Sequence, residues 1–130
     1  MIAPAEPAKV TRALMCSGKI YYELAEERAK RKAEHVAIVR LEQLYPWWPD
    51  LVTASIAPYK QLRECFWVQD EPCNMGAGPF VTPRIESLLR GGNVRYECIS
   101  RVESASPATG SHKAHVLEQQ QILKAAFDPR

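Results

Sequence analysis

The sequence has 130 residues, a formal net charge of +2 and a hydrophobic share of 46%. A chain of this length builds one domain with a hydrophobic core of its own. The small net charge gives no electrostatic basis for binding nucleic acid, which requires a dense basic surface. No apolar stretch is long enough to span a membrane. We therefore expect a globular domain with neither nucleic acid nor membrane among its partners.

Residues 1–9 are rich in proline and alanine and lack the apolar core of a signal peptide. We interpret them as an interdomain linker or the edge of an expressed fragment, and residues 10–130 as the domain. From residue 10 onward, strand patterns alternate with helix patterns. The predicted strands are residues 10–16, 36–41, 64–69 and 94–100, and the predicted helices are about 20–33, 50–58, 80–89 and 113–127. This alternation predicts a three-layer α/β/α sandwich.

Two of the predicted strands differ in their apolar pattern. The run VAIVRL at residues 36–41 is almost continuously apolar, which is typical of a strand covered on both faces in a parallel sheet. Residues 94–100 alternate between apolar and polar side chains, which favours a position nearer the edge.

The basic run at residues 28–32 ends a helix that begins with glutamates, an order that suits the helix dipole. We interpret that run as a solvated helix end.

The cysteines show no Cys-x-x-Cys spacing, so the sequence contains neither a zinc knuckle nor a thioredoxin motif. Cys16, Cys65 and Cys98 lie in apolar, strand-like segments, where a free cysteine behaves as a small hydrophobic residue. We expect these three to be reduced core residues.

Polar residues follow each predicted strand. If the strands are parallel, these clusters share one edge of the sheet, where open α/β sheets bind their ligands. Ser17-Gly18-Lys19 stands at a strand-to-helix turn, and free N–H groups with a nearby cation suit an anion. The alternative is that Ser17 only caps the helix and Lys19 is solvated. Both interpretations remain open from the sequence.

Other candidate motifs are weaker. Gly76-Ala77-Gly78 lacks the third glycine of a dinucleotide-binding fingerprint, so we expect these glycines to allow close backbone approach at a helix start. His112, His115 and Glu118 have a spacing that a metal could use, but no further ligand is evident. No nucleophile motif is present. The residues alone indicate an α/β domain with an anion-binding rim and no required chemistry.

Four stretches together carry a resemblance to a known family. They are LMCSGKIYYEL, VAIVRLEQLYPWW, FWVQDEPCNMGA and SASPATGSHKAHVLEQQQIL, and they occur in the same order over residues 10–127. The chain resembles the C-terminal domain of the thiamine-dependent decarboxylase component of the 2-oxoglutarate dehydrogenase complex. Met75 and Pro79 depart from the usual residues of that family, which affects the expected loop geometry there.

The resemblance implies a transketolase C-terminal-like fold, with about five strands, mostly parallel and one antiparallel. It implies a longer parent enzyme that decarboxylates 2-oxoglutarate oxidatively and transfers succinyl to lipoyl in the citric acid cycle. Thiamine diphosphate and magnesium would bind to the preceding domains, with no cofactor in this one. The chain contains no Gly-Asp-Gly, with which the metal motif of that cofactor begins, so we expect no catalysis from these residues alone.

The resemblance also implies partners. They are the preceding domains, the second subunit of a homodimer, the lipoyl-bearing succinyltransferase component, and acetyl-CoA or AMP as an anionic effector. We hypothesise that Lys19, Arg101 and Lys113 bind that anion. The expected location is the bacterial cytoplasm, or the mitochondrial matrix in a eukaryote. The alternative functions are a stand-alone sensor of a nucleotide or acyl-CoA, and a less supported redox or metal module.

Three expectations concern packing. The SASPATG segment at residues 104–110 is expected to cross the rim as a strap, with Ser104, Ser106 and Thr109 capping backbone groups. Trp47 or Trp48 is expected to face a neighbouring domain or subunit. The apolar side chains of the last helix are expected to pack on the sheet; they are Val116, Leu117, Ile122, Leu123 and Phe127.

Overall fold

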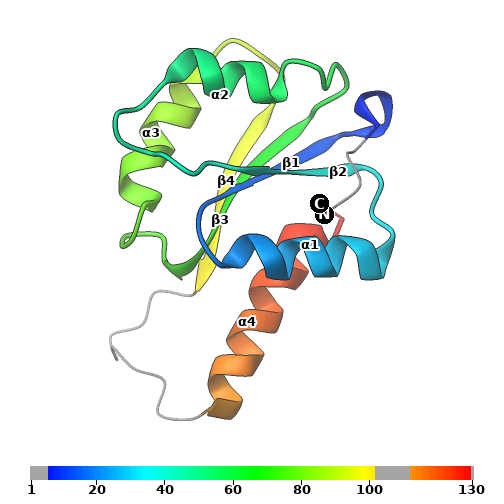
Figure 1. The fold of residues 1–130 in the computed structure, drawn as a ribbon, viewed down its shortest axis with the longest axis vertical. Coiled ribbons are helices and arrows are strands. Elements are labelled where there is room, and N and C mark those ends of the chain that lie inside the picture. Colours follow the sequence, from blue (N-terminus) through cyan, green and yellow to red (C-terminus); the bar gives the residue numbers. More distant parts are fainter. Residues whose placement is uncertain (1–5, 102–111, 130) are drawn as a thin grey trace.

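The computed structural model describes residues 6–101 and 112–129, and of residues 112–114 the backbone only. Every predicted strand and helix is present, with ends that differ by a few residues (Figure 1). A short 3-10 turn, η1 (Pro7–Lys9), precedes them. The elements are β1 (Arg12–Cys16), α1 (Ile20–Arg31), β2 (Val36–Arg40), α2 (Pro49–Ile56), β3 (Glu64–Pro72), α3 (Gly78–Leu89), β4 (Arg95–Arg101) and α4 (His112–Phe127).

The strands form one sheet in the order β2-β1-β3-β4, and every neighbouring pair is parallel. Each connection between successive strands passes through a helix, which returns the chain to the same edge of the sheet and makes the strands parallel. The expectation of about five strands with one antiparallel was therefore wrong for the described residues. They contain four parallel strands, and α4 follows β4.

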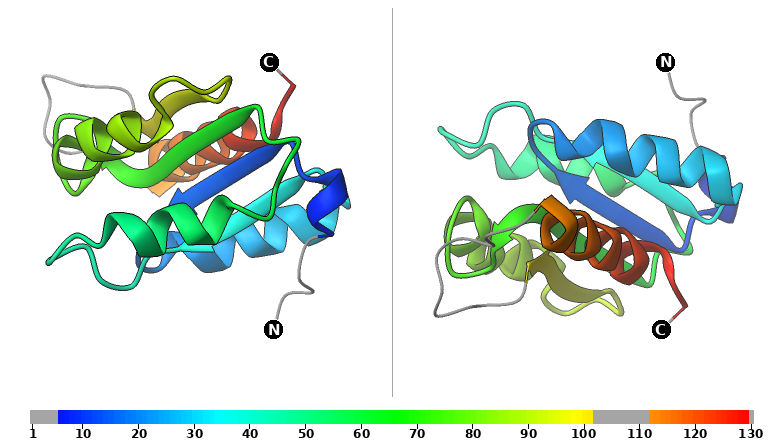
Figure 2. Two further views of the ribbon diagram at one scale, coloured as in Figure 1. Left: turned by 90° about the horizontal axis from the view of Figure 1, so that it is seen from above. Right: turned by 90° about the horizontal axis from the view of Figure 1, so that it is seen from below.

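Helices cover both faces of the sheet, which confirms the three-layer α/β/α class. Helices α1 and α4 lie side by side on one face, and α2 and α3 lie on the other (Figure 2). The core under α1 and α4 includes Leu14, Phe66 and Ile122. The core under α2 and α3 includes Met15 and Trp67, whose side chains point to the opposite face from those of their strand neighbours.

Burial differs between the central and the edge strands. All five residues of β1 are buried, because β1 lies between two strands and under both helical layers. The strand β2 is buried only at its start, and its burial falls toward an exposed Arg40. Complete coverage of VAIVRL was therefore a wrong expectation, because β2 is an edge strand. The expected edge position of β4 is confirmed.

The basic run of α1 was expected to be a solvated helix end, and Lys30, Arg31 and Lys32 are indeed exposed, but two of its arginines also make contacts within the fold. Arg28 donates a hydrogen bond of 2.6 Å to the carbonyl of Val36. Arg31 pairs with Glu27 at 2.6 Å and with Asp128, beyond the end of α4, at 2.9 Å. These contacts join α1 to β2 and to the end of α4, so this part of the chain has a structural role.

Helix α4 packs on the sheet over only part of its length. Ile122 and Phe127 are buried in the core, and Leu123 packs against it. Val116 and Leu117 are 38% and 53% exposed, so the expectation that they pack on the sheet was wrong. The reason is geometric, since the amino-terminal half of α4 extends beyond the end of the sheet (Figure 1). The predicted strap at residues 104–110 lies outside the described residues.

Two of the three cysteine expectations are confirmed. Cys16 and Cys65 are free thiols with no exposed surface. Cys98 was expected to be reduced, but it forms a disulfide with Cys73, and the two Cα atoms are 6.4 Å apart. The sequence interpretation missed this bond because the two cysteines are 25 positions apart and a whole helix lies between them. That helix returns the chain beside β3, where the two cysteines meet.

No described helix is long and apolar enough to cross a membrane.

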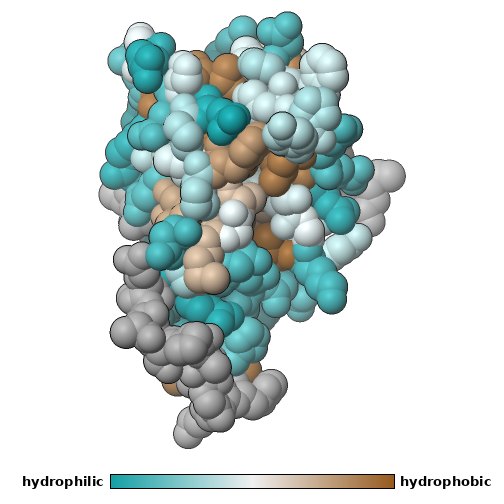
Figure 3. All heavy atoms as spheres, turned by 90° about the vertical axis from the view of Figure 1, so that its left-hand side faces the viewer, coloured by the Kyte–Doolittle hydropathy of each residue, from teal (hydrophilic) through white to brown (hydrophobic). Residues whose placement is uncertain are grey.

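Several large apolar side chains stay uncovered beside α2 and α3. Tyr45, Trp48 and Leu51 are 81%, 55% and 67% exposed. Tyr45 and Trp47 pack against Phe80 of α3, with ring centroids 5.9 and 6.2 Å apart. We call these five residues the aromatic surface. Figure 3 shows apolar side chains reaching the surface in the middle of the face that carries α3.

Candidate functional site

The parallel sheet brings the ends of all four strands to one rim. The chain leaves β1 toward β2 on one side and leaves β3 toward β4 on the other, so the topology switches between β1 and β3. Ligands of open α/β sheets bind at such a switch point. The loops after β1 and β3 therefore form the candidate site.

The loop after β1 contains the first predicted anion-binding residues. Gly18 has a φ of +82°, a left-handed conformation that favours glycine. Lys19 is the N-cap residue of α1 and is exposed, and no side chain caps this helix. The alternative in which Ser17 caps α1 is therefore wrong, whereas a solvated Lys19 agrees with the structure.

Cys16 is the last residue of β1 and lies next to this loop. Burial raises the pKa of its thiol to about 12, against an opposing effect of Arg40. A thiol with such a pKa is protonated at neutral pH, and the thiolate is the reactive form of cysteine. Cys16 is therefore a packing residue and no nucleophile.

Gln69 organises the loop after β3. Its side chain is buried and accepts a hydrogen bond of 2.8 Å from the indole N–H of Trp67. Its amide nitrogen lies within 3.1 Å of three carbonyls, those of Glu71 and Pro72 at the end of β3 and that of Met75 in the loop. Pairing with β4 is interrupted here, and the amide of Gln69 supplies hydrogen bonds to backbone carbonyls in its place.

The first residue of α3 also fixes this loop. A Cβ atom at Gly78 would lie 2.5 Å from the carbonyl oxygen of Cys73, so only glycine fits without rearrangement. This confirms the expectation of close backbone approach at the start of the helix. Gly76, with a φ of +60°, provides the turn that precedes it.

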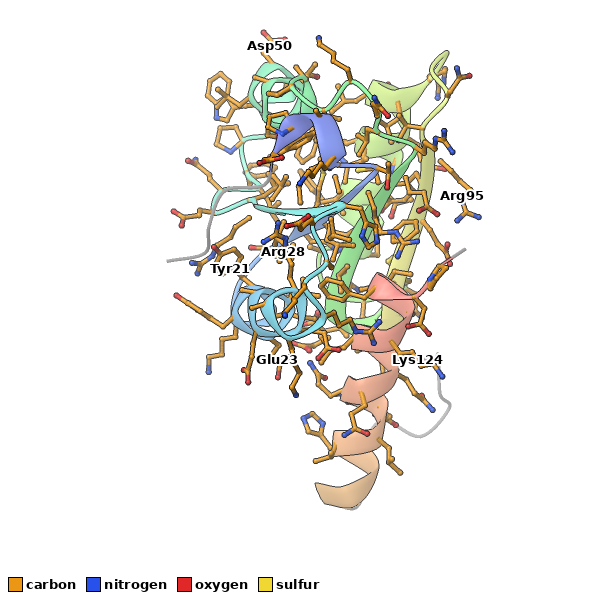
Figure 4. All side chains as sticks on the ribbon, turned by 90° about the vertical axis from the view of Figure 1, so that its right-hand side faces the viewer. Tyr21, Glu23, Arg28, Asp50, Arg95 and Lys124 are labelled. Carbon is orange, nitrogen blue, oxygen red and sulfur yellow. A yellow bond between two sulfur atoms is a disulfide. The ribbon has the colours of Figure 1, made fainter. Side chains whose placement is uncertain are left out.

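Gln119 of α4 joins α1 to the end of β3 beside the candidate site. Its amide nitrogen donates to a carboxylate oxygen of Glu23 on α1 and, at 2.6 Å, to Asp70 at the end of β3. Glu23 lies on the side of α1 that faces α4 (Figure 4). The sequence showed a glutamine-rich helix but gave no signal that one glutamine would join two carboxylates at the rim.

Arg101 and Lys113, the other two predicted anion-binding cations, do not lie in the loop after β1. They belong to β4 and α4. Arg101 ends β4 and lies 3.2 Å from Glu118 and 3.1 Å from Nδ1 of His115. The side chain of Lys113 lies outside the described residues. Since β3 separates β1 from β4, Arg101 is two strands away from the loop at residues 17–19. The structure therefore does not bring Arg101 and Lys19 together.

The electrostatics of the described rim do not suggest a metal centre. No group of three or more His, Cys, Asp or Glu side chains among the described residues could hold a metal ion. Glu118 and His115 contact Arg101, and Glu23 and Asp70 share Gln119. Surface depressions occur at the opposite edge, where one is lined by Thr11, Arg63, Glu64 and Arg95 at the starts of the strands.

Comparison with known proteins gives a consistent result. Residues 2–127 match the family described as 2-oxoglutarate dehydrogenase C-terminal. The chain is 41% identical over 120 residues to a 2-oxoglutarate dehydrogenase E1 component of Rickettsia felis and 44% identical over 121 residues to one of Cupriavidus necator. It is 43% identical over 121 residues to a multifunctional 2-oxoglutarate metabolism enzyme of a Mycobacterium species.

These matches cover 91–93% of the chain but only 10–12% of the length of the relatives. The chain thus corresponds to a small part of each of them. The order of the motifs, the α/β/α fold and the match over residues 2–127 all point to the same family. The chain belongs to the 2-oxoglutarate dehydrogenase C-terminal family.

Proposed function

We propose that the chain serves as the C-terminal accessory domain of a 2-oxoglutarate dehydrogenase E1 component. The full enzyme would decarboxylate 2-oxoglutarate oxidatively and transfer the succinyl group to the lipoyl arm of the succinyltransferase component. The family match and the small share of each relative that the chain covers support this proposal.

The chemistry of that enzyme requires thiamine diphosphate and magnesium. The described residues do not fit this group, because they offer no cluster of metal ligands and Gln119 already hydrogen-bonds the rim carboxylates Glu23 and Asp70. We therefore assign the cofactor to other parts of the enzyme. The chain on its own should not turn over 2-oxoglutarate, which an assay with added cofactor and magnesium can check.

The aromatic surface is the observation that carries the accessory role. Trp48 and Leu51 are more than half exposed, and Tyr45 is more exposed still. Exposed apolar side chains in a cluster indicate a contact that another part of the protein covers. About nine-tenths of each relative lies outside the matched segment, which supplies enough chain to cover it. We assign this surface to docking against the preceding domains and to support of the homodimer.

The experiment uses the full-length polypeptide that contains this chain. Changing Trp48→Gln and Leu51→Gln together should loosen the dimer and lower decarboxylase activity at low protein concentration, because the docking contact is lost. The measurements are sedimentation velocity and specific activity as functions of concentration. Tyr22→Gln is the matched control, since Tyr22 is 61% exposed on α1 in the opposite layer. Equal behaviour of the double variant and this control would contradict the docking role.

The anion-binding role remains a finer proposal. Lys19 is exposed after a left-handed Gly18, which suits an anion at the start of α1. Arg101 would have to leave Glu118 before it could contribute. Thermal melting of the full enzyme with acetyl-CoA or AMP should show a shift that Lys19→Ala reduces. An unchanged shift in Lys19→Ala would place the effector elsewhere.

A further inference from the structure

The four cysteines fall into two chemically different pairs. Cys16 and Cys65 have no exposed surface, and burial raises the pKa of each thiol to about 12. Neither thiol can react with a solution reagent while the chain is folded. Cys73 and Cys98 are bonded to each other, and both are only partly buried. Thiol chemistry in the native chain is therefore confined to this disulfide.

The disulfide connects a loop to a strand. Cys73 directly follows Pro72, the last residue of β3, and Cys98 lies in the middle of β4. Regular pairing of these two strands is interrupted between Val68 and Pro72, where four steps along β3 correspond to two along β4. Cys98 lies opposite Trp67, inside the regular part of the ladder, so the covalent bond ties the chain just beyond the interruption back to β4.

The same segment carries the contacts that position α4. Asp70, three residues before Cys73, accepts the hydrogen bond of Gln119. Arg101, three residues after Cys98, pairs with Glu118 on the same helix. Both anchors of the projecting half of α4 thus lie within three residues of a disulfide cysteine. A change at the disulfide would reach the rim and the start of α4.

We propose that Cys73 and Cys98 form a thiol–disulfide exchange site whose oxidation state controls the order of the loop after β3. The reductant is a low-molecular-weight thiol. Its thiolate attacks one sulfur and gives a mixed disulfide while the other cysteine leaves as a thiolate. A second thiol then releases the first cysteine. The protein disulfide gains two electrons and two protons, and the two reductant molecules become one disulfide. An oxidised disulfide of the same class restores the bond.

The first test counts reactive thiols. The chain is equilibrated with mixtures of reduced and oxidised glutathione and alkylated without denaturant, and intact mass gives the number of modified cysteines. We expect no modification at the oxidised end and two modified cysteines at the reduced end, mapped to Cys73 and Cys98. A count that does not change with the ratio would overturn the proposal.

The second test uses hydrogen–deuterium exchange to measure how well the loop protects its backbone amides. On reduction, amides of residues 69–78 should exchange about tenfold faster, while those of β1 stay unchanged, because only the loop loses a covalent anchor. The double variant Cys73→Ser, Cys98→Ser should exchange like the reduced chain and ignore reductant. The proposal fails if the loop is unaffected by reduction. It also fails if exchange rises throughout the chain, since the disulfide would then be a global staple.

Discussion

The two helical layers of this domain differ in how completely the chain covers them. In the layer of α1 and α4, polar contacts hold α4 in place at two points. Gln119 bonds Glu23 and Asp70 at the rim, and Arg12 bonds the carbonyl of Ala126 near the last turn of α4. The layer of α2 and α3 leaves Tyr45, Trp48 and Leu51 exposed. The first layer also exposes apolar side chains, Tyr22 on α1 and Val116 and Leu117 on the projecting half of α4. The two layers differ because polar contacts hold the first together at both ends, whereas exposed aromatic side chains gather beside the second. Substitutions in the two layers should therefore affect different properties, stability in the first and association in the second.

The largest effect is expected for Arg12→Ala. Arg12 is 2% exposed, bonds Glu64 at 2.9 Å and donates hydrogen bonds of 2.8 Å to the carbonyls of Ala126 and Asp128. Removing the guanidinium leaves these acceptors without their partner, which typically costs about 3–5 kcal/mol for a buried ion pair. Denaturant unfolding monitored by circular dichroism measures the loss.

Arg95→Ala is the matched control for Arg12. Arg95 contacts the other oxygen of the same Glu64 carboxylate at 2.8 Å, but its side chain is 55% exposed. An exposed pair contributes about 1 kcal/mol or less. Similar losses for the two variants would show that the position of Arg12 under α4 is not what stabilises this layer.

The next effect separates the two halves of α4. Ile122 is 2% exposed, so Ile122→Ala should destabilise the chain by about 2–5 kcal/mol through lost burial and a cavity. Leu117, five residues earlier, is 53% exposed, and Leu117→Ala should change the free energy of unfolding by about 0.5 kcal/mol or less. If Leu117→Ala were equally costly, the projecting half of α4 would have to pack on the domain in solution.

The fold was largely predictable because strand and helix patterns depend on local sequence. Apolar runs, continuous or alternating, marked the strands, and the glutamate-to-arginine order marked α1. The place of a strand in the sheet depends on long-range pairing, so VAIVRL was assigned full coverage although β2 is an edge strand. Likewise, α4 has apolar residues along its whole length, but the sheet ends before the helix does.

The candidate site was only partly predictable. The sequence identified the rim and the turn at Gly18, because strand ends and glycine preferences are local features. It could not show that Glu118 pairs with Arg101 or that Gln119 joins Glu23 to Asp70, because these residues lie on different elements. The disulfide was missed for the same reason.

Alkaline pH provides a probe of burial in each layer. Cys65 lies under α2 and α3, and burial raises the pKa of its thiol from 9.0 to about 12. Above pH 9 the unfolded chain loses this proton and the folded chain keeps it, so the free energy of unfolding falls with rising pH. Relative to Cys65→Ala, the wild-type chain should lose about 1.4 kcal/mol between pH 7 and pH 10.

Cys16 allows the same measurement under α1 and α4, since the pKa of its thiol is also raised to about 12. Cys16→Ala should therefore change the pH dependence by a similar amount. Unfolding curves at pH 7, 9 and 10 provide the data for both variants. A wild-type chain with the same pH dependence as Cys65→Ala would mean that water reaches the core under α2 and α3.

The smallest effect on stability is expected at the aromatic surface. Leu51 and Val52 are neighbours on α2, but Leu51 is 67% exposed and Val52 only 5%. Leu51→Gln keeps a good helix former and removes no buried contact, so the free energy of unfolding should change by about 0.5 kcal/mol or less. Val52→Ala should cost at least about 1 kcal/mol, because it removes methyl groups from the core. Sedimentation velocity should show less self-association for Leu51→Gln than for the wild-type chain, since an exposed apolar residue favours contact with any partner. If Leu51→Gln were as destabilising as Val52→Ala and left association unchanged, the aromatic surface would be part of the chain's own core. The difference between the two layers would then disappear.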